Sequence, residues 1–329
     1  MGSTLRLTSE EASTRLRTRL HYKVSNFHAM YSSVLGGIVT DPALMVLPLD
    51  DHMAHRGHAV FDTAALVDGK LYQLEPHLQR LLRSAEMARI QLPCEPDQLR
   101  QIIMDTAAAS GRRDASVRYW LSAGPGGFGL SPTECVGSSF YVMIFRPQPE
   151  PERFYTQGVT LVTSSVPIKP PFFARVKSNN YLPNVLVQLE AGDQGADHGL
   201  FLDEEGYVAE SSHMNVAFVN ADNVLCHPPY DAILTGITAQ RVLHLARQLV
   251  NSGDLEGIAL RKVPVEEWKA AREMMLLGSS LKVAPVVRWD GEPVGDGRPG
   301  PIARKLLAMW KADQREAADQ LVPVPYGDS

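Results

Sequence analysis

With 329 residues, the chain is long enough for two domains that each bury a core. Its 44% hydrophobic and 21% charged residues are typical of a globular protein, which argues against wholesale disorder. A net charge of −5 provides no basic surface for nucleic acid, and no apolar run approaches the length of a membrane span.

Three widely spaced cysteines, Cys94, Cys135 and Cys226, indicate a reducing compartment and argue against a disulfide scaffold or a thiolate metal site. Residues 1–20 contain several arginines but lack the apolar stretch of a secretory signal. Glu10 and Glu11 disfavour a transit peptide in this stretch. We therefore expect a cytoplasmic protein, or an organellar one if a transit peptide has been removed.

The first part of the chain mixes a hairpin with helices. Residues 59–67 predict a strand, Asp68-Gly69 a turn, and residues 71–74 the returning strand. Glu75-Pro76 opens a predicted helix whose apolar face carries Leu78, Leu81, Leu82 and Ala85. A second helix is predicted over residues 97–109, and buried strands over residues 117–122 and 139–145. This order indicates an α+β domain and not a doubly wound one.

A run of alternating prolines, Arg146-Pro-Gln-Pro-Glu-Pro-Glu152, favours an extended connector. We therefore predict a small N-terminal domain over residues 1–146, a linker over 147–156 and a large C-terminal domain over 157–329.

The second part of the chain is rich in predicted strands. These cover residues 159–166, 199–202, 207–209, 215–219 and 223–226, with a turn at residues 203–206. Helical spacing of apolar residues predicts a helix over 239–250, and a final helix over about 301–321.

Four separated segments carry the residue types of one known chemistry. They are Arg56-Gly-His-Ala-Val-Phe61 with His77-Leu-Gln-Arg80; Val176-Lys177-Ser-Asn-Asn-Tyr181; Glu205-Gly-Tyr-Val-Ala-Glu210-Ser-Ser-His-Met-Asn215; and Ile233-Leu-Thr-Gly236-Ile-Thr238 with Gly278-Ser-Ser280. In this order they resemble the class IV aminotransferases. Residues 30–37, 51–63, 118–126 and 176–185 most resemble the plant-type D-amino acid aminotransferases. The resemblance implies a two-domain fold: a small α/β N-terminal domain and a larger strand-rich pseudo-barrel C-terminal domain. It also implies pyridoxal 5'-phosphate (PLP) as cofactor, an active site between the domains, and a homodimer whose partner subunit completes that site with a loop.

PLP catalysis needs a lysine amine that attacks the cofactor aldehyde and later moves substrate protons. The resemblance makes Lys177 this Schiff-base lysine; the alternative is a solvated surface lysine. The ring nitrogen needs an acidic partner, which the resemblance assigns to Glu210, and Tyr181 is expected near the phenolic oxygen.

The cofactor phosphate needs backbone donors, which the start of a helix supplies together with the positive end of its dipole. Thr235-Gly-Ile-Thr238 opens the predicted helix, and Gly236 permits a close approach of the backbone. By resemblance, the remaining cofactor contacts are Arg80, Leu234, Ile237, Thr238 and Ser279.

The substrate carboxylate has no obvious partner, because Gly127-Phe-Gly129 stands where bacterial D-amino acid aminotransferases carry Arg-x-His. Arg56, Arg118 and Ser280 are the candidates for this role. His58 and Phe61 are expected beside the substrate.

Two further motifs suggest other sites. Gly124-Pro-Gly-Gly-Phe-Gly129 matches a dinucleotide-binding pattern, but Ser131-Pro132 breaks the helix that such a site requires. His52, His55 and His58 resemble a metal tract, yet Gly57 disfavours a continuous helix and no acidic or thiolate cluster completes the set. We expect an active-site loop and a structural turn, respectively.

The leading hypothesis is amino transfer between a D-amino acid and a 2-oxo acid. The alternatives are an aminodeoxychorismate lyase, and a branched-chain or (R)-amine aminotransferase. From other classes, a PLP-binding protein without turnover and a plain ligand-binding domain also stay open.

Overall fold

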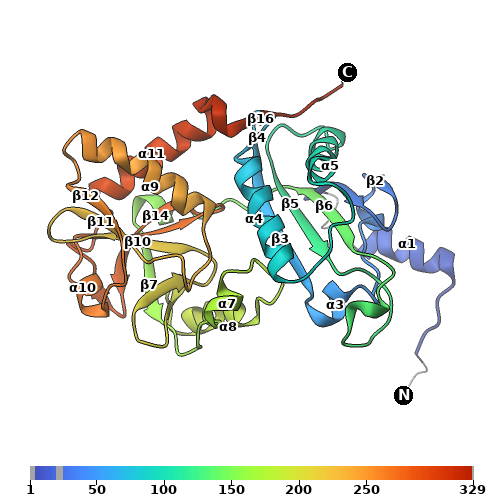
Figure 1. Cartoon of the computed structure of the whole chain (residues 1–329), viewed down its shortest axis with the longest axis horizontal. Coiled ribbons are helices and arrows are strands. Elements are labelled where there is room, and N and C mark those ends of the chain that lie inside the picture. Colours follow the sequence, from blue (N-terminus) through green and yellow to red (C-terminus); the bar gives the residue numbers. More distant parts are fainter. Residues whose placement is uncertain (1–3, 20–24, 328–329) are drawn as a thin grey trace. The chain divides into compact units, whose positions relative to one another are not determined.

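The computed structural model describes residues 4–19 and 25–327 and divides into two compact units. The first contains Met1–Gln148 and Leu321–Ser329, and the second contains Pro149–Gln320. Each unit has one sheet with helices packed on it (Figure 1). The mixture of helices and sheets agrees with the predicted α+β class.

The first unit is built on an antiparallel sheet of seven strands. In spatial order they are β16 (Leu321–Pro323), β4 (Lys70–Tyr72), β3 (Ala59–Val67), β5 (Ala115–Ser122), β6 (Ser139–Phe145), β1 (Phe27–Ser32) and β2 (Gly37–Val39). Its helices are α1 (Ser9–Arg19), α3 (His52–Arg56), α4 (Leu74–Met87) and α5 (Pro96–Ala109), with short 3-10 turns at Pro42–Leu44 and Pro132–Glu134.

The predicted elements of this unit are largely confirmed. Strands β3 and β6 have the predicted bounds, and α5 begins one residue before its predicted start. The returning strand is shorter than predicted, because Gln73 adopts a left-handed φ of 53° and α4 begins at the next residue. The prediction that residues 71–74 all belong to a strand is therefore wrong at its end.

Strand β16 belongs to the first unit, although the sequence predicted residues 157–329 to form the other domain. It pairs with β4, with Val322 opposite Leu71. The predicted final helix is wrong over its last turn: α11 (Pro301–Glu316) stops at Glu316, and a 3-10 turn (Ala318–Gln320) leads into β16. The C-terminal residues thus leave the predicted 157–329 domain, since their backbone donors pair with an edge strand of the other unit.

The second unit contains a mixed sheet. Its strands, in spatial order, are β12 (Gly257–Leu260), β11 (Val224–His227), β10 (Asn215–Val219), β13 (Glu273–Gly278), β14 (Lys282–Trp289), β7 (Val159–Thr163), β8 (His198–Leu202) and β9 (Val208–Ser211), and β15 (Glu292–Pro293) pairs with β14. Its helices are α6 (Arg153–Thr156), α7 (Pro171–Ala174), α8 (Leu182–Asp193), α9 (Ile237–Asn251), α10 (Val265–Lys269) and α11.

This sheet curls on itself. β9 and β10 are five steps apart in the strand order, which in a flat sheet would separate them by about 24 Å. Only residues 212–214 connect them, a stretch that spans at most about 14 Å from Ser211 to Asn215. The Ser211 amide also donates to Met214 O at 2.8 Å. The connection therefore forces the sheet into a half-barrel and brings the end of β9 beside the start of β10.

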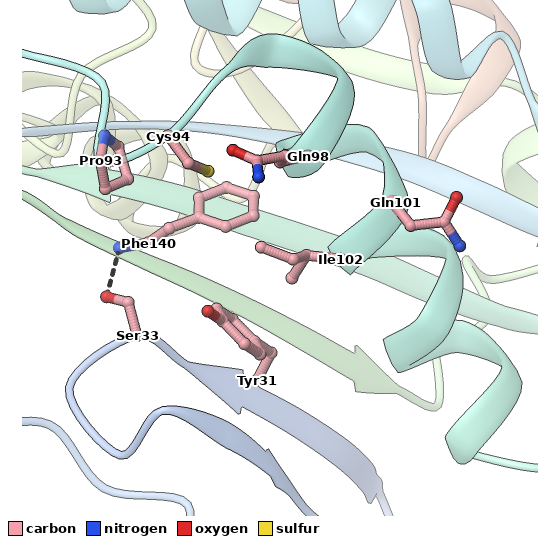
Figure 2. Close-up of a pocket in the computed structure, with 8 residues that line it drawn as sticks. All are labelled: Tyr31, Ser33, Pro93, Cys94, Gln98, Gln101, Ile102 and Phe140. Atoms are coloured by element: carbon pink, nitrogen blue, oxygen red, sulfur yellow. Dashed lines mark hydrogen bonds between the residues drawn. The ribbon is translucent and has the colours of Figure 1, made fainter.

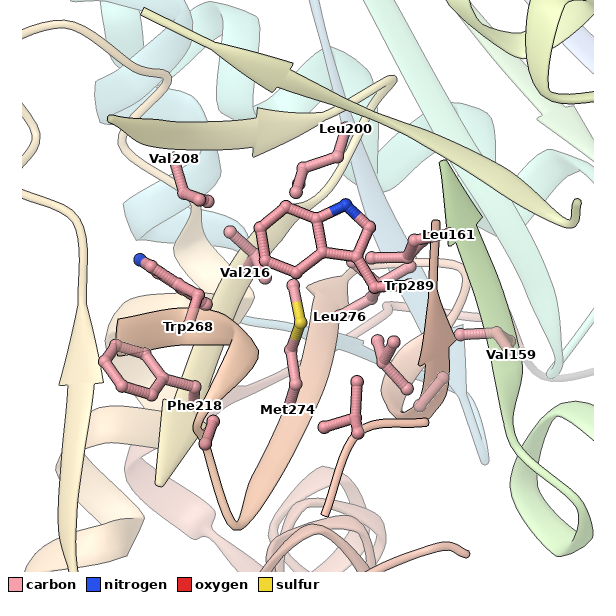
Figure 3. Close-up of a cluster of buried hydrophobic side chains, with 14 of the residues drawn as sticks. Val159, Leu161, Leu200, Val208, Val216, Phe218, Trp268, Met274, Leu276 and Trp289 are labelled. Carbon is pink, nitrogen blue, oxygen red and sulfur yellow. The ribbon is translucent and has the colours of Figure 1, made fainter. Parts of the chain in front are cut away.

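An aromatic core stabilises this half-barrel. Trp268 packs on Phe218 with ring centroids 4.1 Å apart, and Figure 3 shows Trp289 in the same cluster. Phe154 of α6 also belongs to it and is buried. Since Phe154 lies within the predicted 147–156 linker, the end of that segment packs into the second unit and is not a free connector.

Within residues 4–19 and 25–327, no helix is long and apolar enough to cross a membrane.

Candidate active site

The segment that leads into helix α9 carries the predicted phosphate-binding residues. Gly236 is its N-cap and, as a glycine, has no side chain that could cap the first-turn amides. Thr238 is buried at the helix start, and its Oγ1 lies 3.4 Å from Ser279 Oγ of the turn between β13 and β14. The fold thereby joins two predicted hydroxyl ligands that are 41 residues apart.

The carboxylate of Glu210 is held beside this segment. Glu210 lies on β9 and is buried, and its Oε2 accepts the Leu234 amide at 3.3 Å. Asn215, the first residue of β10, donates its Nδ2 to Leu234 O at 3.0 Å and lies 3.5 Å from the same Glu210 oxygen. Strand curling therefore places the acidic group against the loop that opens α9.

Lys177 and Tyr181 also meet. Lys177 is half-buried, and its Nζ donates to the Tyr181 hydroxyl at 3.2 Å. Lys169 lies over the face of the same ring, with its Nζ 5.0 Å from the centroid. Two cationic side chains therefore lie beside the Tyr181 ring, as the predicted place near the anionic phenolic oxygen of the cofactor would require.

Helix α8 ties the lysine segment to the glutamate strand. It begins immediately after Tyr181, and its buried Asn184 donates to Ser212 O, two residues beyond Glu210. The Lys177–Tyr181 segment is thus anchored to the same β9–β10 turn that positions Glu210.

Together these groups fit a cofactor with a phosphate at one end and a basic ring nitrogen at the other. The uncapped start of α9 and the Thr238–Ser279 hydroxyl pair suit a dianion. The buried Glu210 carboxylate suits a protonated ring nitrogen. A half-buried lysine supplies the amine.

The other predicted cofactor residue, Arg80, is buried in the first unit. Its Nε and Nη2 bond both oxygens of Asp62 at 2.8 and 2.7 Å, and His77 Nδ1 lies 2.7 Å from Asp62. Burial alone would raise the pKa of Asp62, but the charges of Arg80 and His77 outweigh it and hold that pKa well below its usual range. Arg80 is therefore fixed in one orientation by a carboxylate.

The predicted substrate residues of the first unit fall into two places. Arg118 of β5 lies over the Phe61 ring, 5.5 Å from its centroid, and donates to Thr63 Oγ1 at 2.9 Å. His58 is turned toward the end of α4, where its Nε2 lies 2.9 Å from Ala88 O. In the second unit, Ser280 is exposed beside Ser279.

The guanidinium of Arg56 is engaged by a loop and not by an open site. It donates to the carbonyls of His55, Phe128 and Gly129. The loop also closes on itself, since Glu134 accepts the Gly129 amide at 3.1 Å. Arg56 thus holds the glycine-rich loop and is a poor candidate for the substrate carboxylate.

The geometry of the two alternative motifs of the first unit differs from what their sites would require. A 3-10 turn follows the glycine-rich loop, where a dinucleotide site would need a helix start. Within the described residues no group of three His, Cys, Asp or Glu side chains is arranged to hold a metal.

A surface pocket of about 430 Å³ lies between α5 and β1 (Figure 2). The rings of Tyr31 and Phe140 and the thiol of Cys94 line it, and no charged side chain is among its lining residues. It offers no partner for the two charged ends of an amino acid.

Sequence reasoning assigned no role to Asp62 or Asn215. For Asp62 a signal exists: an acidic residue stands among buried strand positions that are otherwise apolar, which requires a buried partner. Asn215 ends the third of the four family-like segments, but its role does not follow from the sequence, because its partner Leu234 is bound through a backbone carbonyl.

Comparison with known proteins identifies the family. The family model described as amino-transferase class IV matches residues 59–289. The chain belongs to the class IV aminotransferases. It is therefore a transferase enzyme, as predicted. The chain is 50% identical over 322 residues to the D-amino-acid transaminase, chloroplastic, of Arabidopsis thaliana, covering 97% of this chain and 85% of that protein.

More distant relatives of this class IV aminotransferase are named for other substrates. A putative branched-chain-amino-acid aminotransferase of Methanocaldococcus jannaschii is 29% identical, with 84% of this chain and 94% of that protein covered. The crystal structure of a branched-chain amino acid aminotransferase with pyridoxamine 5'-phosphate is 26% identical. It superposes with a TM-score of 0.83 and covers 91% of this chain and 99% of its own. The predicted two-domain class IV fold is thus confirmed.

Proposed function

We propose that this class IV aminotransferase moves an amino group between a D-amino acid and a 2-oxo acid, with pyridoxal 5'-phosphate as cofactor. The observation that carries the proposal is the 50% identity, over nearly the whole chain, to a protein named D-amino-acid transaminase. The second unit supports it by joining Lys177 to Tyr181, and Glu210 to the loop that opens α9.

The residues act in three places. PLP, when bound, supplies an aldehyde for the amino group and an electron-withdrawing ring. Lys177 Nζ would hold the cofactor through its aldehyde carbon, with the aldehyde oxygen released as water, and would accept the α-proton of the substrate. Glu210 keeps a negative charge at the ring nitrogen, while the start of α9, Thr238 and Ser279 bind phosphate. Leu234, Gly236 and Ile237 complete this cofactor set.

The site residues of the first unit, and Ser280 of the second, stay predictions. Arg80 is proposed as a phosphate cation, and Arg118, Phe61, His58 and Ser280 as substrate contacts. The buried Arg80–Asp62 pair and the stacked Arg118–Phe61 pair support these roles only by fixing the side chains.

The test is a donor screen on purified enzyme with 2-oxoglutarate. D-Alanine should yield pyruvate and glutamate, and L-alanine should give at least about tenfold less, since a pocket that discriminates one group contributes about 1–3 kcal/mol. Rapid reaction of L-leucine without D-alanine turnover would favour the branched-chain alternative. Release of pyruvate from aminodeoxychorismate without any oxo acid would favour the lyase.

We also propose a homodimer that uses helix α8. Leu182, Val185, Leu186 and Leu189 follow helical spacing along one face and are 42–67% exposed. Phe172 and Phe173 of α7 are about half exposed as well. An apolar face of this size marks an interaction surface in a folded protein. No charged residue occurs in residues 182–189, so a two-fold axis can place this face against its own copy without like-charge repulsion.

Sedimentation velocity tests the dimer. Leu186→Asp, which puts a charge in the middle of the face, should convert the dimer to a monomer, whereas Glu204→Gln on an exposed turn outside this face should not. A monomeric parent protein would contradict the proposal.

The three cysteines are all free thiols, two of them half-buried and one buried. We propose a reducing compartment, the cytoplasm or the interior of an organelle. A fluorescent fusion located in the secretory pathway would contradict this location.

A further inference from the structure

Asn215 occupies the point where three parts of the second unit meet. It is the first residue of β10, it is buried, and it follows the tight connection from β9. Its side-chain amide lies against two other elements: the Glu210 carboxylate of β9 and the loop that opens α9.

The peptide groups of Leu234 show how these elements are joined. Its N–H donates to Glu210 Oε2 at 3.3 Å, and its C=O accepts from Asn215 Nδ2 at 3.0 Å. Because Asn215 Nδ2 is also 3.5 Å from that same oxygen, carboxylate, amide and loop form a closed ring of contacts. Movement of the loop therefore moves the carboxylate, and the reverse holds as well.

The other face of the Asn215 amide sets the position of the helix start. A Cβ atom added to Gly236 would lie 1.8 Å from Asn215 Oδ1. The φ of Gly236 is −70°, which any residue can adopt, so glycine is required here by contact with Asn215 and not by backbone conformation. Asn215 thus determines how far the N-cap of α9 approaches the sheet.

We propose that Asn215 is a positioning residue that couples the two ends of the cofactor site, the ring-nitrogen carboxylate of Glu210 and the phosphate-binding start of α9. The inference rests on the proposed cofactor site. It adds that occupation of one end organises the other, so that phosphate and the ring bind cooperatively. Asn215 itself touches neither reacting atom.

Ligand binding to the apoprotein distinguishes this positioning role from a merely structural one. Wild-type apoprotein should bind pyridoxal, which lacks the phosphate, several-fold more tightly when inorganic phosphate is present. Asn215→Ala should abolish this enhancement and raise the Kd for PLP at least about tenfold, which corresponds to about 1.4 kcal/mol. Fluorescence titration measures both without any turnover.

Asn220→Ala is the matched control. Asn220 follows the other end of the same strand, and its Oδ1 accepts the Val224 amide at 2.8 Å. Its loss should lower the thermal midpoint but leave the PLP Kd and the phosphate enhancement at the wild-type values. Asn215→Ala with an unchanged Kd and an unchanged enhancement would overturn the inference, whatever its thermal midpoint.

A second pair of variants tests the contact with Gly236. Gly236→Ala should raise the PLP Kd, because the added methyl displaces the Asn215 amide. In the double variant with Asn215→Ala, the nearest remaining contact of that methyl is Ala239 Cβ at 3.3 Å. The combined loss should therefore be smaller than the product of the two single losses. A multiplicative loss would contradict the coupling.

These outcomes are distinct from failure of the proposed function. A wild-type protein whose pyridoxal binding is enhanced by phosphate but which does not use D-amino acids would contradict the proposed substrate. It would not contradict this inference. A wild-type apoprotein that takes up no PLP overturns both.

Discussion

Arg80 bonds both carboxylate oxygens of Asp62, from helix α4 to strand β3, with both side chains buried. A planar guanidinium held at two points cannot rotate, so its remaining N–H groups keep one direction. His77 adds a second donor to the same carboxylate. Arg80, a predicted cofactor ligand, is therefore oriented by Asp62. Asp62 lies outside the four segments that resemble the class IV aminotransferases.

Replacing Asp62 with Asn should be strongly destabilising, because it leaves the buried Arg80 guanidinium without its counter-charge. We expect a loss of about 3–5 kcal/mol in the free energy of unfolding, measured by urea denaturation at pH 7. The depressed pKa means that the contribution of Asp62 is present above about pH 4 and is lost only as the pH falls further. Equal stability of Asp62→Asn and wild type at pH 7 would contradict the buried pair.

Lys177→Ala should remove the amine that reacts with the cofactor. Turnover should fall at least about 10³-fold, since both covalent attachment and proton transfer are lost. Borohydride reduction of the wild-type holoenzyme followed by peptide mass spectrometry should label Lys177. Lys169→Ala is the control, because Lys169 faces the same Tyr181 ring but should not be labelled. A label on any other lysine would refute the assignment.

His227 should make the protein less stable in mild acid. Burial lowers the pKa of His227 to about 4 from 6.5, so the unfolded chain binds more protons between these values. Stability from the neutral imidazole is present above pH 6.5 and should decline by about 3 kcal/mol as the pH falls to 4. His227→Asn should flatten this part of the profile of unfolding free energy against pH. An unchanged slope would show that other groups cause the decline.

Arg56→Lys should loosen the glycine-rich loop, because one ammonium cannot reproduce the separate bonds to Phe128 and Gly129 carbonyls. Phe128 and Leu130 are exposed in this loop and are chymotrypsin sites. A loss of about 1 kcal/mol should raise cleavage there roughly fivefold. Arg83→Lys, on a position of α4 away from this loop, should leave the cleavage rate unchanged, and equal rates for the two variants would contradict the loop-holding role.

Local patterns were enough to predict much of the secondary structure. The strand predicted over residues 59–67 and the helices predicted over 97–109 and 239–250 lie close to the observed bounds of β3, α5 and α9. For α9 the reason is that the spacing of apolar residues reports which face is buried. The end of α11 was misjudged, because whether a chain continues as a helix or joins a sheet depends on a distant edge strand.

The sequence by itself predicted the family, which the comparisons confirm. It also proposed Lys177 as the reactive lysine and Glu210 as the acidic partner of the ring nitrogen, because both lie in short motifs whose residue types the chemistry demands. Only the tertiary structure decided which other groups position the predicted site residues. Leu234 meets Asn215 across 19 residues and Arg80 meets Asp62 across 18. The physical reason is that such contacts arise from sheet curling and helix docking, and a backbone carbonyl leaves no mark of its partner in the sequence.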